Sequence, residues 1–592
     1  MCGIAGIFSS SSWSDRHSSA LQAMQSSLLH RGPDDFGLWS HPASGAGLAH
    51  TRLSILDLSP AGHQPMVSHD ERYVISFNGE IYNFRELRTE CEAQGLNFRT
   101  HTDTEVLLHL YATQGASMVT RLRGMFAFCI WDQQERTAFL ARDPLGIKPL
   151  YYSNLHGELA FASELRALRR SGLISQEKNP AAILDFLMTG SVPEPATLLR
   201  DVNLLEAGHT LTWKSGQTRI DSFWHLKLGT GSPHADPVAL TRQSLLDSIR
   251  AHFVSDVPVG LFLSGGLDST TLLALACASG QPKPDTFSIS VEDVGLNEGN
   301  VAQQTAQHFG TRHHNFHLSD KTGEALFIDY LDKIDQPSID GFNSFVVSRF
   351  ARDAGTKVAL SGVGGDELFG GYPSFTEVPK LTRLLQLGRC IPGIGKAIEY
   401  GSPKPQWRRV GDVLRRPVTI TSVWQAKRGI FTHREASILT QHFNSQKIQD
   451  NPSESLPSPA SDLIPKDEVS SLEFKKYMRN QLLRDSDVMS MACGLELRLP
   501  FVDSHLVDAI GHLPASQRLQ VGKQLLVDAV PEIPNWVRNQ PKRGFVFPFE
   551  KWLGGTLNES FSSATSSIPF SNPTWYQRWA VFMLDHWLAK TA

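Results

Sequence analysis

The chain has few cysteines, no long apolar run and no excess of one charge. Its 592 residues include six cysteines with no C-x-x-C pair, which disfavours a disulfide framework and a zinc site. Lysine and arginine number 56 against 60 for aspartate and glutamate, so nucleic acid and anionic membranes are not expected partners. No stretch approaches the roughly 18 apolar residues of a membrane span, and the start lacks the positive flank of a signal peptide. We therefore expect a cytoplasmic protein with reduced thiols.

Length and pattern predict two domains. A chain of 592 residues exceeds what a single hydrophobic core supports. Residues 1–215 contain short apolar segments broken by Gly, Pro, Asn and Asp, which predicts an α+β domain with antiparallel strands. After a polar stretch at 229–236, residues 236–592 alternate strands and helices, which predicts an α/β domain around a parallel sheet. Residues 382–467 are less clear, and a Ser/Pro-rich segment at 451–461 is expected to be a surface loop.

The same patterns predict individual elements. The expected strands cover residues 3–8, 72–77, 125–131, 137–141, 259–263, 286–291 and 357–360. The expected helices cover residues 19–29, 103–111, 270–277, 301–309 and 342–354. Thr102 or Asp103 is expected to cap the helix over 103–111.

Cys2 directly follows Met1. Removal of one residue would therefore place a thiol and a free α-amine on the same residue. A thiol has a pKa near about 8.5 and an α-amine near about 7.7 to 8.0, so the amine can accept the thiol proton at neutral pH. Such a residue can act as an acyl-transfer nucleophile. The alternative is a small residue packed at the start of a buried strand, and Cys2 considered alone favours that alternative.

A candidate phosphate-binding loop follows the strand over 259–263. The run Ser264-Gly265-Gly266-Leu267-Asp268-Ser269 leads directly into a helix. Its glycines let backbone N–H groups approach phosphate oxygens, the hydroxyls add donors, and the helix N-terminus adds positive potential. No lysine occupies the Walker A position, so γ-phosphate transfer is not expected. A glycine-rich turn alone can be only a tight turn, but the complete run is a more specific sign of phosphate binding.

With this loop and the Cys2 start, the chain resembles the glutamine-hydrolysing asparagine synthetases. In that family a class-II glutamine amidotransferase domain precedes a synthetase domain of the ATP-pyrophosphatase type. The resemblance runs nearly end to end. Its motifs lie at residues 30–34, 50–55, 77–83, 102–105, 142–151, 360–362, 365–372 and 489–503.

The resemblance implies an αββα fold of the N-terminal-nucleophile hydrolase type for residues 1–215. Cys2 would attack the side-chain amide of glutamine, form a thioester and free ammonia. Asn78 and the backbone N–H of Gly79 match the oxyanion hole. The residues that match the glutamine-binding positions are Arg52, Asn78, Glu80 and Asp103, with Arg52 on the α-carboxylate and the two acids on the α-ammonium. Considered singly, Arg52 could equally be a surface ion pair and Asn78 a turn residue.

For residues 236–592 the resemblance implies that ATP adenylates an acceptor carboxylate and that ammonia arrives through an internal tunnel. The implied ATP and pyrophosphate positions are Leu263, Ser264, Gly265, Gly266, Asp268, Ser269, Ile289, Ser361, Gly362 and Lys523. Asp268 and Asp366 match ligands of Mg²⁺. Lys523 matches a catalytic lysine that balances phosphate charge, although a lysine at the start of a helix is more often a solvated surface charge.

Val363 departs from the family pattern. Many members carry an acidic residue here, thought to deprotonate ammonia or organise the acceptor site, and valine cannot accept a proton. Either Glu367 or another carboxylate does this, or the acceptor is not free aspartate. Residues 335–341 precede the helix expected to line this site, and the sequence does not indicate what they bind.

The sequence therefore predicts an ATP-dependent amide synthetase that uses glutamine, ATP and a small carboxylate, with aspartate as the expected acceptor. A first alternative keeps the chemistry but takes a carboxylate on a sugar, a peptide or a secondary metabolite. A second alternative is a degenerate protein that binds nucleotide but has no synthetase activity. Cys2, Arg52, Asn78, Asp268 and Lys523 count against that second alternative. A homodimer is left open.

Overall fold

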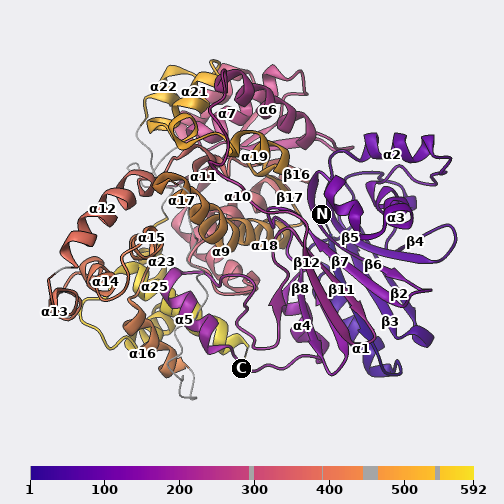
Figure 1. The fold of residues 1–592 in the computed structure, drawn as a ribbon, viewed down its shortest axis with the longest axis horizontal. Helices are drawn as coiled ribbons and strands as arrows, with labels where there is room; N and C mark the ends of the chain where they lie inside the picture. The colour runs from indigo at the N-terminus through magenta and orange to yellow at the C-terminus, as the bar shows by residue number, and fades with distance from the viewer. Residues whose placement is uncertain (1, 292–298, 390, 444–463, 541–546, 592) are drawn as a thin grey trace.

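The computed structural model describes residues 2–291, 299–389, 391–443, 464–540 and 547–591. Figure 1 shows the strands of the N-terminal part gathered on one side and helices α12 to α16 and α25 on the other. The loop expected at 451–461 lies outside the described residues. No helix in the described part of the chain combines the length and apolarity that a membrane crossing requires.

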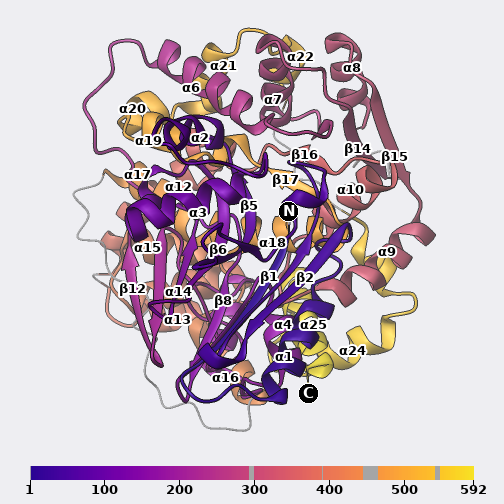
Figure 2. The ribbon, with the colours of Figure 1, turned by 90° about the vertical axis from the view of Figure 1, so that its right-hand side faces the viewer.

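Two antiparallel sheets build the N-terminal part (Figure 2). The first has the order β10-β8-β9-β1-β3-β2 and the second the order β12-β11-β7-β6-β5-β4. The first sheet contains β1 (Gly3–Ser9), β2 (Asp35–His41), β3 (Ala46–Arg52), β8 (Tyr151–Leu155), β9 (Glu158–Ala162) and β10 (Asn203–Leu204). The second contains β4 (Met66–Val67), β5 (Tyr73–Ile81), β6 (Gly124–Asp132), β7 (Thr137–Arg142), β11 (His209–Lys214) and β12 (Gln217–Ser222). Strand β12 continues this sheet past residue 215, the end of the domain expected from the sequence.

Alternation along β1 explains the layering. Ile4 and Phe8 pack into the core between the two sheets, whereas Ala5 and Ile7 face the cluster that includes α1 (Asp15–Ser27). Helices α2 (Phe84–Ala93) and α3 (Asp103–Gln114) cover the outer face of the second sheet. The result is the αββα order that the family resemblance implied. Thr102 caps α3, since its hydroxyl accepts a hydrogen bond from the Glu105 N–H.

A five-stranded parallel sheet with the order β15-β14-β13-β16-β17 forms the centre of the C-terminal part. Its strands are β13 (Val259–Phe262), β14 (Thr286–Val291), β15 (His313–Leu318), β16 (Val358–Leu360) and β17 (Glu496–Arg498). The predictions at 259–263, 286–291 and 357–360 are confirmed. The pattern analysis missed β17, because three residues are too few to show a period.

Helices surround this sheet and extend away from it. They are α6 (Pro237–His252), α7 (Leu267–Ala278), α8 (Gly299–Phe309), α9 (Asp320–Lys333), α10 (Phe342–Asp353), α11 (Gly365–Phe369), α18 (Arg484–Ala492), α19 (Ser504–Gly511), α20 (Ala515–Arg518), α21 (Gln524–Ala529) and α22 (Asn535–Arg538). A helical extension contains α12 (Ser374–Gly388), α13 (Ile394–Gly401), α14 (Pro405–Leu414), α15 (Ile420–Arg428), α16 (His433–Phe443) and α17 (Pro465–Leu472). A π-helix (Glu473–Leu483) joins α17 to α18, and α23 (Phe549–Leu553), α24 (Asn558–Ser566) and α25 (Trp575–Lys590) follow.

The two parts share a hydrophobic core. One buried cluster runs from β1 and α1 through α4 (Leu165–Ser171) and α5 (Pro180–Thr189) to α16 and α25. A buried ion pair joins the parts elsewhere, with 2.6 Å between Arg123 Nη2 and Asp503 Oδ2. The relative position of the two parts is therefore determined by side-chain packing as well as by the covalent link.

Candidate active site

Cys2 directly precedes β1, and Asn78 of β5 and Arg31, which follows α1, hold its backbone. Its N–H donates to Asn78 Oδ1 at 2.9 Å, and its carbonyl accepts from Arg31 Nε at 3.0 Å. The residue is 8% exposed. Burial raises the pKa of the Cys2 thiol, while a backbone hydrogen bond from Leu53 and the charge of Arg52 oppose that rise.

Asn78, whose Oδ1 accepts from the Cys2 N–H, also carries a hydrogen-bond donor. Its Nδ2 is buried and has no hydrogen-bond partner among the described residues. An unpaired buried N–H costs about 1–3 kcal/mol, so such donors are retained mainly where they have a function. The next residue, Gly79, has φ 154°, and a Cβ there would lie 2.1 Å from the Met125 carbonyl oxygen. The close backbone approach therefore requires glycine at this position.

A small cavity of about 30 Å³ brings together three of the four predicted glutamine-binding residues, and Asn78 is not among the residues that line it. Its lining includes Cys2, Arg52, Gly79, Glu80 and Asp103. The Arg52 guanidinium donates to the carbonyl oxygens of Leu56 at 3.2 Å, Asp57 at 2.6 Å and Ser59 at 3.0 Å. Arg52 is therefore no surface ion pair, and a bound α-carboxylate would share or replace its contacts with the segment 56–59.

Burial and mutual repulsion shift the pKa values of the acids at this cavity. Burial raises the pKa of Asp103 to about 7. Burial and the nearby Glu496 carboxylate raise the pKa of Glu80 well above its usual range. Burial opposes the ionisation of Glu496 as well, but Arg498 and Lys148 lower the pKa of Glu496 to about 2.

Arg498 connects this cavity to the parallel sheet. Its Nη2 lies 3.4 Å from Glu80 Oε2, and its Nε lies 2.5 Å from Glu496 Oε1. Its backbone carbonyl accepts a hydrogen bond from the Ser361 N–H at 2.9 Å. One residue of β17 thus contacts a glutamine-site carboxylate with its side chain and a predicted nucleotide-site residue with its backbone. The sequence analysis included Arg498 in a family motif but assigned it no role.

A second buried network ties Cys2 to α18. Besides bonding the Cys2 carbonyl, Arg31 forms ion pairs with Glu164 at 2.9 Å and Asp487 at 2.8 Å. Lys148 Nζ lies 3.3 Å from the same Asp487 carboxylate. All four charged side chains are buried, so removing one partner would leave the others without charge compensation.

The predicted phosphate loop lies at the carboxyl end of β13 and opens α7. The Gly266 N–H donates to Ser264 Oγ at 3.2 Å, and the Ser264 N–H donates to Ser269 Oγ at 3.2 Å. Gly265 has φ 75°, a conformation that favours glycine. Neighbouring parallel strands end at the same sheet edge, so β16 brings Ser361 and Gly362 beside this loop. A Cβ on Gly362 would lie 3.0 Å from the Asp268 Cβ. Leu263, which follows β13, and Ile289, which lies in β14, are both buried.

Lys523 reaches this loop from a distant part of the chain. Its Nζ lies 2.6 Å from both carboxylate oxygens of Asp268 and 2.6 Å from Asp366 Oδ1. Lys523 is 5% exposed, which excludes the surface-charge alternative. Burial opposes its charge, but the two carboxylates raise the pKa of Lys523 above its ordinary value. Glycine at 371 leaves room for the lysine, since a Cβ there would lie 2.3 Å from Lys523 Cε.

Glu367 is a buried acid next to this cluster. Tyr372 Oη donates to Glu367 Oε1 at 2.8 Å. Burial, together with the adjacent Asp366 carboxylate, raises the pKa of Glu367 to about 7. Val363, in contrast, is half-buried and packs against the apolar core. Glu367 is thus a carboxyl group next to Asp366 that can exchange a proton near neutral pH.

Comparison with known proteins places both halves in described families. The glutamine amidotransferase domain family matches residues 1–224, and the asparagine synthase family matches residues 240–583. Asparagine synthetase (glutamine-hydrolyzing) 1 of Bacillus subtilis (strain 168) is 34% identical, covering 94% of this chain and 89% of that protein. A putative asparagine synthetase (glutamine-hydrolyzing) of Mycobacterium tuberculosis (strain ATCC 25618 / H37Rv) is 32% identical, covering 93% and 87%. Amidase chry2 of Gibberella zeae is 26% identical, covering 92% and 87%.

Proposed function

Because this chain belongs to the glutamine-hydrolysing asparagine synthetase family, we propose that it releases ammonia from glutamine at Cys2 and amidates an adenylated carboxylate, with aspartate as acceptor. It is a carbon–nitrogen ligase with glutamine as the amide donor. The observation that carries the proposal is the position of Arg498, which contacts Glu80 beside Cys2 and Ser361 beside the phosphate loop. Residues 1–215 would form the glutaminase and residues 236–592 the synthetase.

In the first half-reaction, removal of Met1 would leave the Cys2 α-amine near Asn78 Oδ1, the present partner of the Cys2 nitrogen. The amine takes the thiol proton and the thiolate attacks the glutamine amide carbon. The oxyanion accepts hydrogen bonds from Asn78 Nδ2 and the Gly79 N–H. The nitrogen leaves as ammonia with the proton returned by the amine, and water then hydrolyses the thioester to glutamate.

In the second half-reaction, an acceptor oxygen attacks the α-phosphorus of ATP and pyrophosphate leaves. Lys523 would balance the charge of the separating phosphates. Ammonia then attacks the acyl-adenylate, AMP leaves, and Glu367 would accept the proton that the new amide nitrogen loses. Because Glu367 has a pKa near 7, it can hold that proton and release it again at physiological pH.

Asp268 and Asp366 would hold Mg²⁺ in this half-reaction. An oxygen of each carboxylate lies 2.6 Å from Lys523 Nζ, so the two groups are close together, and carboxylate oxygens are ligands that Mg²⁺ prefers. Among the described residues no group of three or more His, Cys, Asp or Glu side chains could hold a metal ion. Two carboxylates fit an ion that takes its other ligands from phosphate and water. When bound, the ion would neutralise phosphate charge.

Pyrophosphate release across a panel of carboxylates tests the acceptor. With glutamine, ATP and Mg²⁺ present, we expect aspartate to stimulate release above the rate without acceptor. Release with a sugar acid, a peptide or another organic acid, but not with aspartate, would show that aspartate is not the acceptor and that the proposed reaction takes place on another carboxylate. Val363 favours that second candidate, because a change from an acidic to an apolar residue alters which substrate is tolerated. No release with any acceptor would contradict the synthetase function.

Glu367→Gln is expected to impair ammonia capture about 100-fold without stopping adenylation. In the parent enzyme the ratio of amide product to glutamate should rise as pH increases through about 7, because only the ionised carboxylate accepts a proton. The variant should show a low ratio without this rise. Both products are measured in the same samples, so that the pH dependence of glutamine hydrolysis cancels in their ratio. A variant with the parent's pH profile would show that Glu367 is not the proton acceptor.

A further inference from the structure

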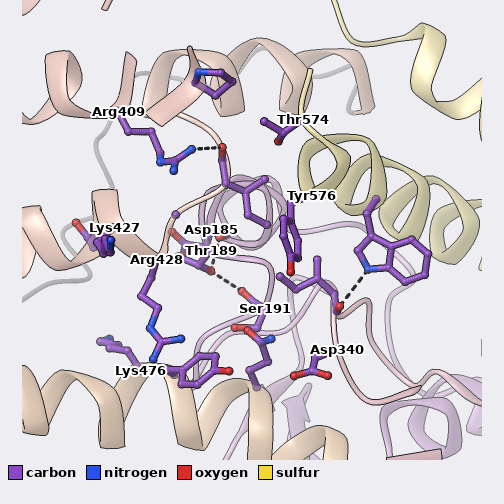
Figure 3. Close-up of a pocket in the computed structure, with 18 of the residues that line it drawn as sticks. Asp185, Thr189, Ser191, Asp340, Arg409, Lys427, Arg428, Lys476, Thr574 and Tyr576 are labelled. Atoms are coloured by element: carbon purple, nitrogen blue, oxygen red, sulfur yellow. Dashed lines mark hydrogen bonds between the residues drawn. The ribbon is translucent and has the colours of Figure 1, made fainter. Parts of the chain in front are cut away.

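The helical extension contributes to a cavity of about 830 Å³, and no residue assigned to either reaction centre lines it. Figure 3 shows side chains from α5, α14, α15, the π-helix and α25 arranged around it. Ile339 and Asp340 also line it. The segment 335–341, whose ligand the sequence did not indicate, therefore forms part of this wall. The volume falls in the range of roughly 300–1,000 Å³ typical of small-molecule sites.

Most charged groups of this cavity are already satisfied by the protein. Arg428 pairs with Glu473 at 2.7 Å, and Lys427 pairs with Glu377 at 2.5 Å. Arg409 donates to the carbonyl oxygens of Ala426 at 2.8 Å and Ile430 at 3.2 Å. Asp340 accepts hydrogen bonds from the Gly341 N–H and the Gln481 side chain. These groups shape the wall and have little capacity left for a ligand.

Asp185 and Lys476 differ from these groups. Among the described residues, neither the Asp185 carboxylate nor the Lys476 ammonium has a hydrogen-bond or ion-pair partner, although both line the cavity. Burial raises the pKa of Asp185 to about 6, although the charge of Lys476 opposes that rise. Burial lowers the pKa of Lys476, and the charges of Glu194 and Asp185 oppose that change. The protein thus places in the same cavity an acid and a base that influence each other's charge but have no direct hydrogen bond or ion pair among the described residues.

Aromatic side chains form much of the remaining wall. They are Trp424, Tyr477, Phe547, Phe549, Trp575, Tyr576 and Trp579. Thr189, Ser191 and Asn480 add small polar groups. Such a wall accommodates an apolar or ring-bearing body, and aromatic faces contribute much of the binding energy in sites of this kind.

Only a thin wall separates the cavity from the proposed acceptor site. The Arg428 guanidinium lies over the rings of Tyr372 at 4.4 Å and Tyr477 at 3.8 Å. Tyr372 in turn donates to Glu367, so one tyrosine layer lies between the cavity and the carboxyl group that would accept the ammonia proton. A ligand in the cavity would therefore lie next to the reaction centre.

We propose that this cavity binds a zwitterionic ligand of the amino-acid or short-peptide class, larger than aspartate, with its ammonium on Asp185 and its carboxylate on Lys476. Its apolar body packs against the aromatic wall. The ligand is either the distal part of a peptide-like acceptor or a separate amino-acid effector. If the ligand is an effector, the proposal does not depend on which acceptor the enzyme uses. If the ligand is part of an acceptor, the proposal rests on the proposed function.

Binding of L-alanyl-L-phenylalanine to the full-length protein tests the site, with tryptophan fluorescence as the readout because three tryptophans line the cavity. We expect saturable binding that weakens at least tenfold when the dipeptide is N-acetylated or C-amidated. Asp185→Asn and Lys476→Met should each weaken binding at least tenfold. Lys427→Met is the matched control, because its ammonium already pairs with Glu377, and it should bind like the parent. Near-ultraviolet circular dichroism verifies that each variant is folded.

Activity assays distinguish the two sources. If L-aspartyl-L-phenylalanine supports pyrophosphate release that both variants weaken, the ligand is an acceptor. If L-alanyl-L-phenylalanine instead changes the rate with aspartate and is not consumed, the ligand is an effector. The site is wrong if the dipeptide does not bind, if blocked dipeptides bind equally well, or if neither folded variant changes affinity. Those results would leave glutamine hydrolysis and ATP-dependent synthesis, and hence the proposed function, unaffected.

Discussion

Replacing Cys2 with alanine is expected to reduce glutamine hydrolysis by about 1,000-fold or more, while synthesis from ammonium salts continues. The effect is large because the thiol supplies the nucleophile, and no other described thiol lines the cavity with Arg52 and Glu80. Ammonium-dependent synthesis should persist, since Lys523, Asp268 and Glu367 lie in the other part of the chain. Glutamate formation and pyrophosphate release, measured separately with glutamine and with ammonium chloride, check both halves.

Cys91→Ala is the control for the loss of a buried thiol. Cys91 is buried in the α2 cluster, so its replacement tests the effect of a small packing defect within the same domain. It should hydrolyse glutamine at a rate close to that of the parent. Normal glutamine hydrolysis by Cys2→Ala would disprove the assignment of the nucleophile. If Cys2→Ala also lost ammonium-dependent synthesis, the result would show that the buried network of Arg31 and Asp487 couples the structure of the two sites.

Lys523→Met is expected to impair the synthetase reaction and to spare glutamine hydrolysis, the reverse of Cys2→Ala. Pyrophosphate release should fall by about 100-fold to 1,000-fold, because the variant loses the positive charge that lies between two carboxylates and faces the phosphate loop. Asp268 and Asp366 would then repel one another, which adds to the loss. Glutamine hydrolysis without ATP should continue, since Cys2 and Asn78 do not contact Lys523. Both activities are measured on the same preparation.

Lys333→Met provides the comparison for Lys523→Met. Lys333 forms a partly exposed pair with Asp329, an interaction worth about 0.5 kcal/mol or less, so its removal should leave both activities unchanged. If Lys523→Met released pyrophosphate at the parent rate, the lysine would be structural. If it lost both activities and its thermal transition, a folding defect would be the explanation.

Sequence reasoning predicted the elements that follow local rules. The short apolar segments at 3–8 and 259–263 predicted β1 and β13, because an apolar run bounded by turn residues is visible within a few residues. Family motifs supplied Asn78 and Lys523 as candidates. The buried contacts of both now support that assignment, since Asn78 bonds the Cys2 backbone and Lys523 contacts two carboxylates.

The contacts between distant segments could not be predicted in this way. Arg498 meets Glu80 and Arg31 meets Asp487 across hundreds of residues, and no periodicity or spacing relates such partners. Asp185 and Lys476 likewise share a cavity only because α5 packs near the π-helix.

Local patterns in the sequence determined the antiparallel N-terminal part, the parallel-sheet C-terminal part and the phosphate loop, because each strand or loop is encoded in a short continuous segment. The resemblance to the family added the αββα order and the role of Cys2 as nucleophile candidate. Only the tertiary structure decided which charges are compensated, how the two centres are joined through Arg498, and where the second cavity lies. The physical reason is that the free energy of a buried charge depends on its neighbours in space, and chain folding selects those neighbours without regard to their separation in sequence.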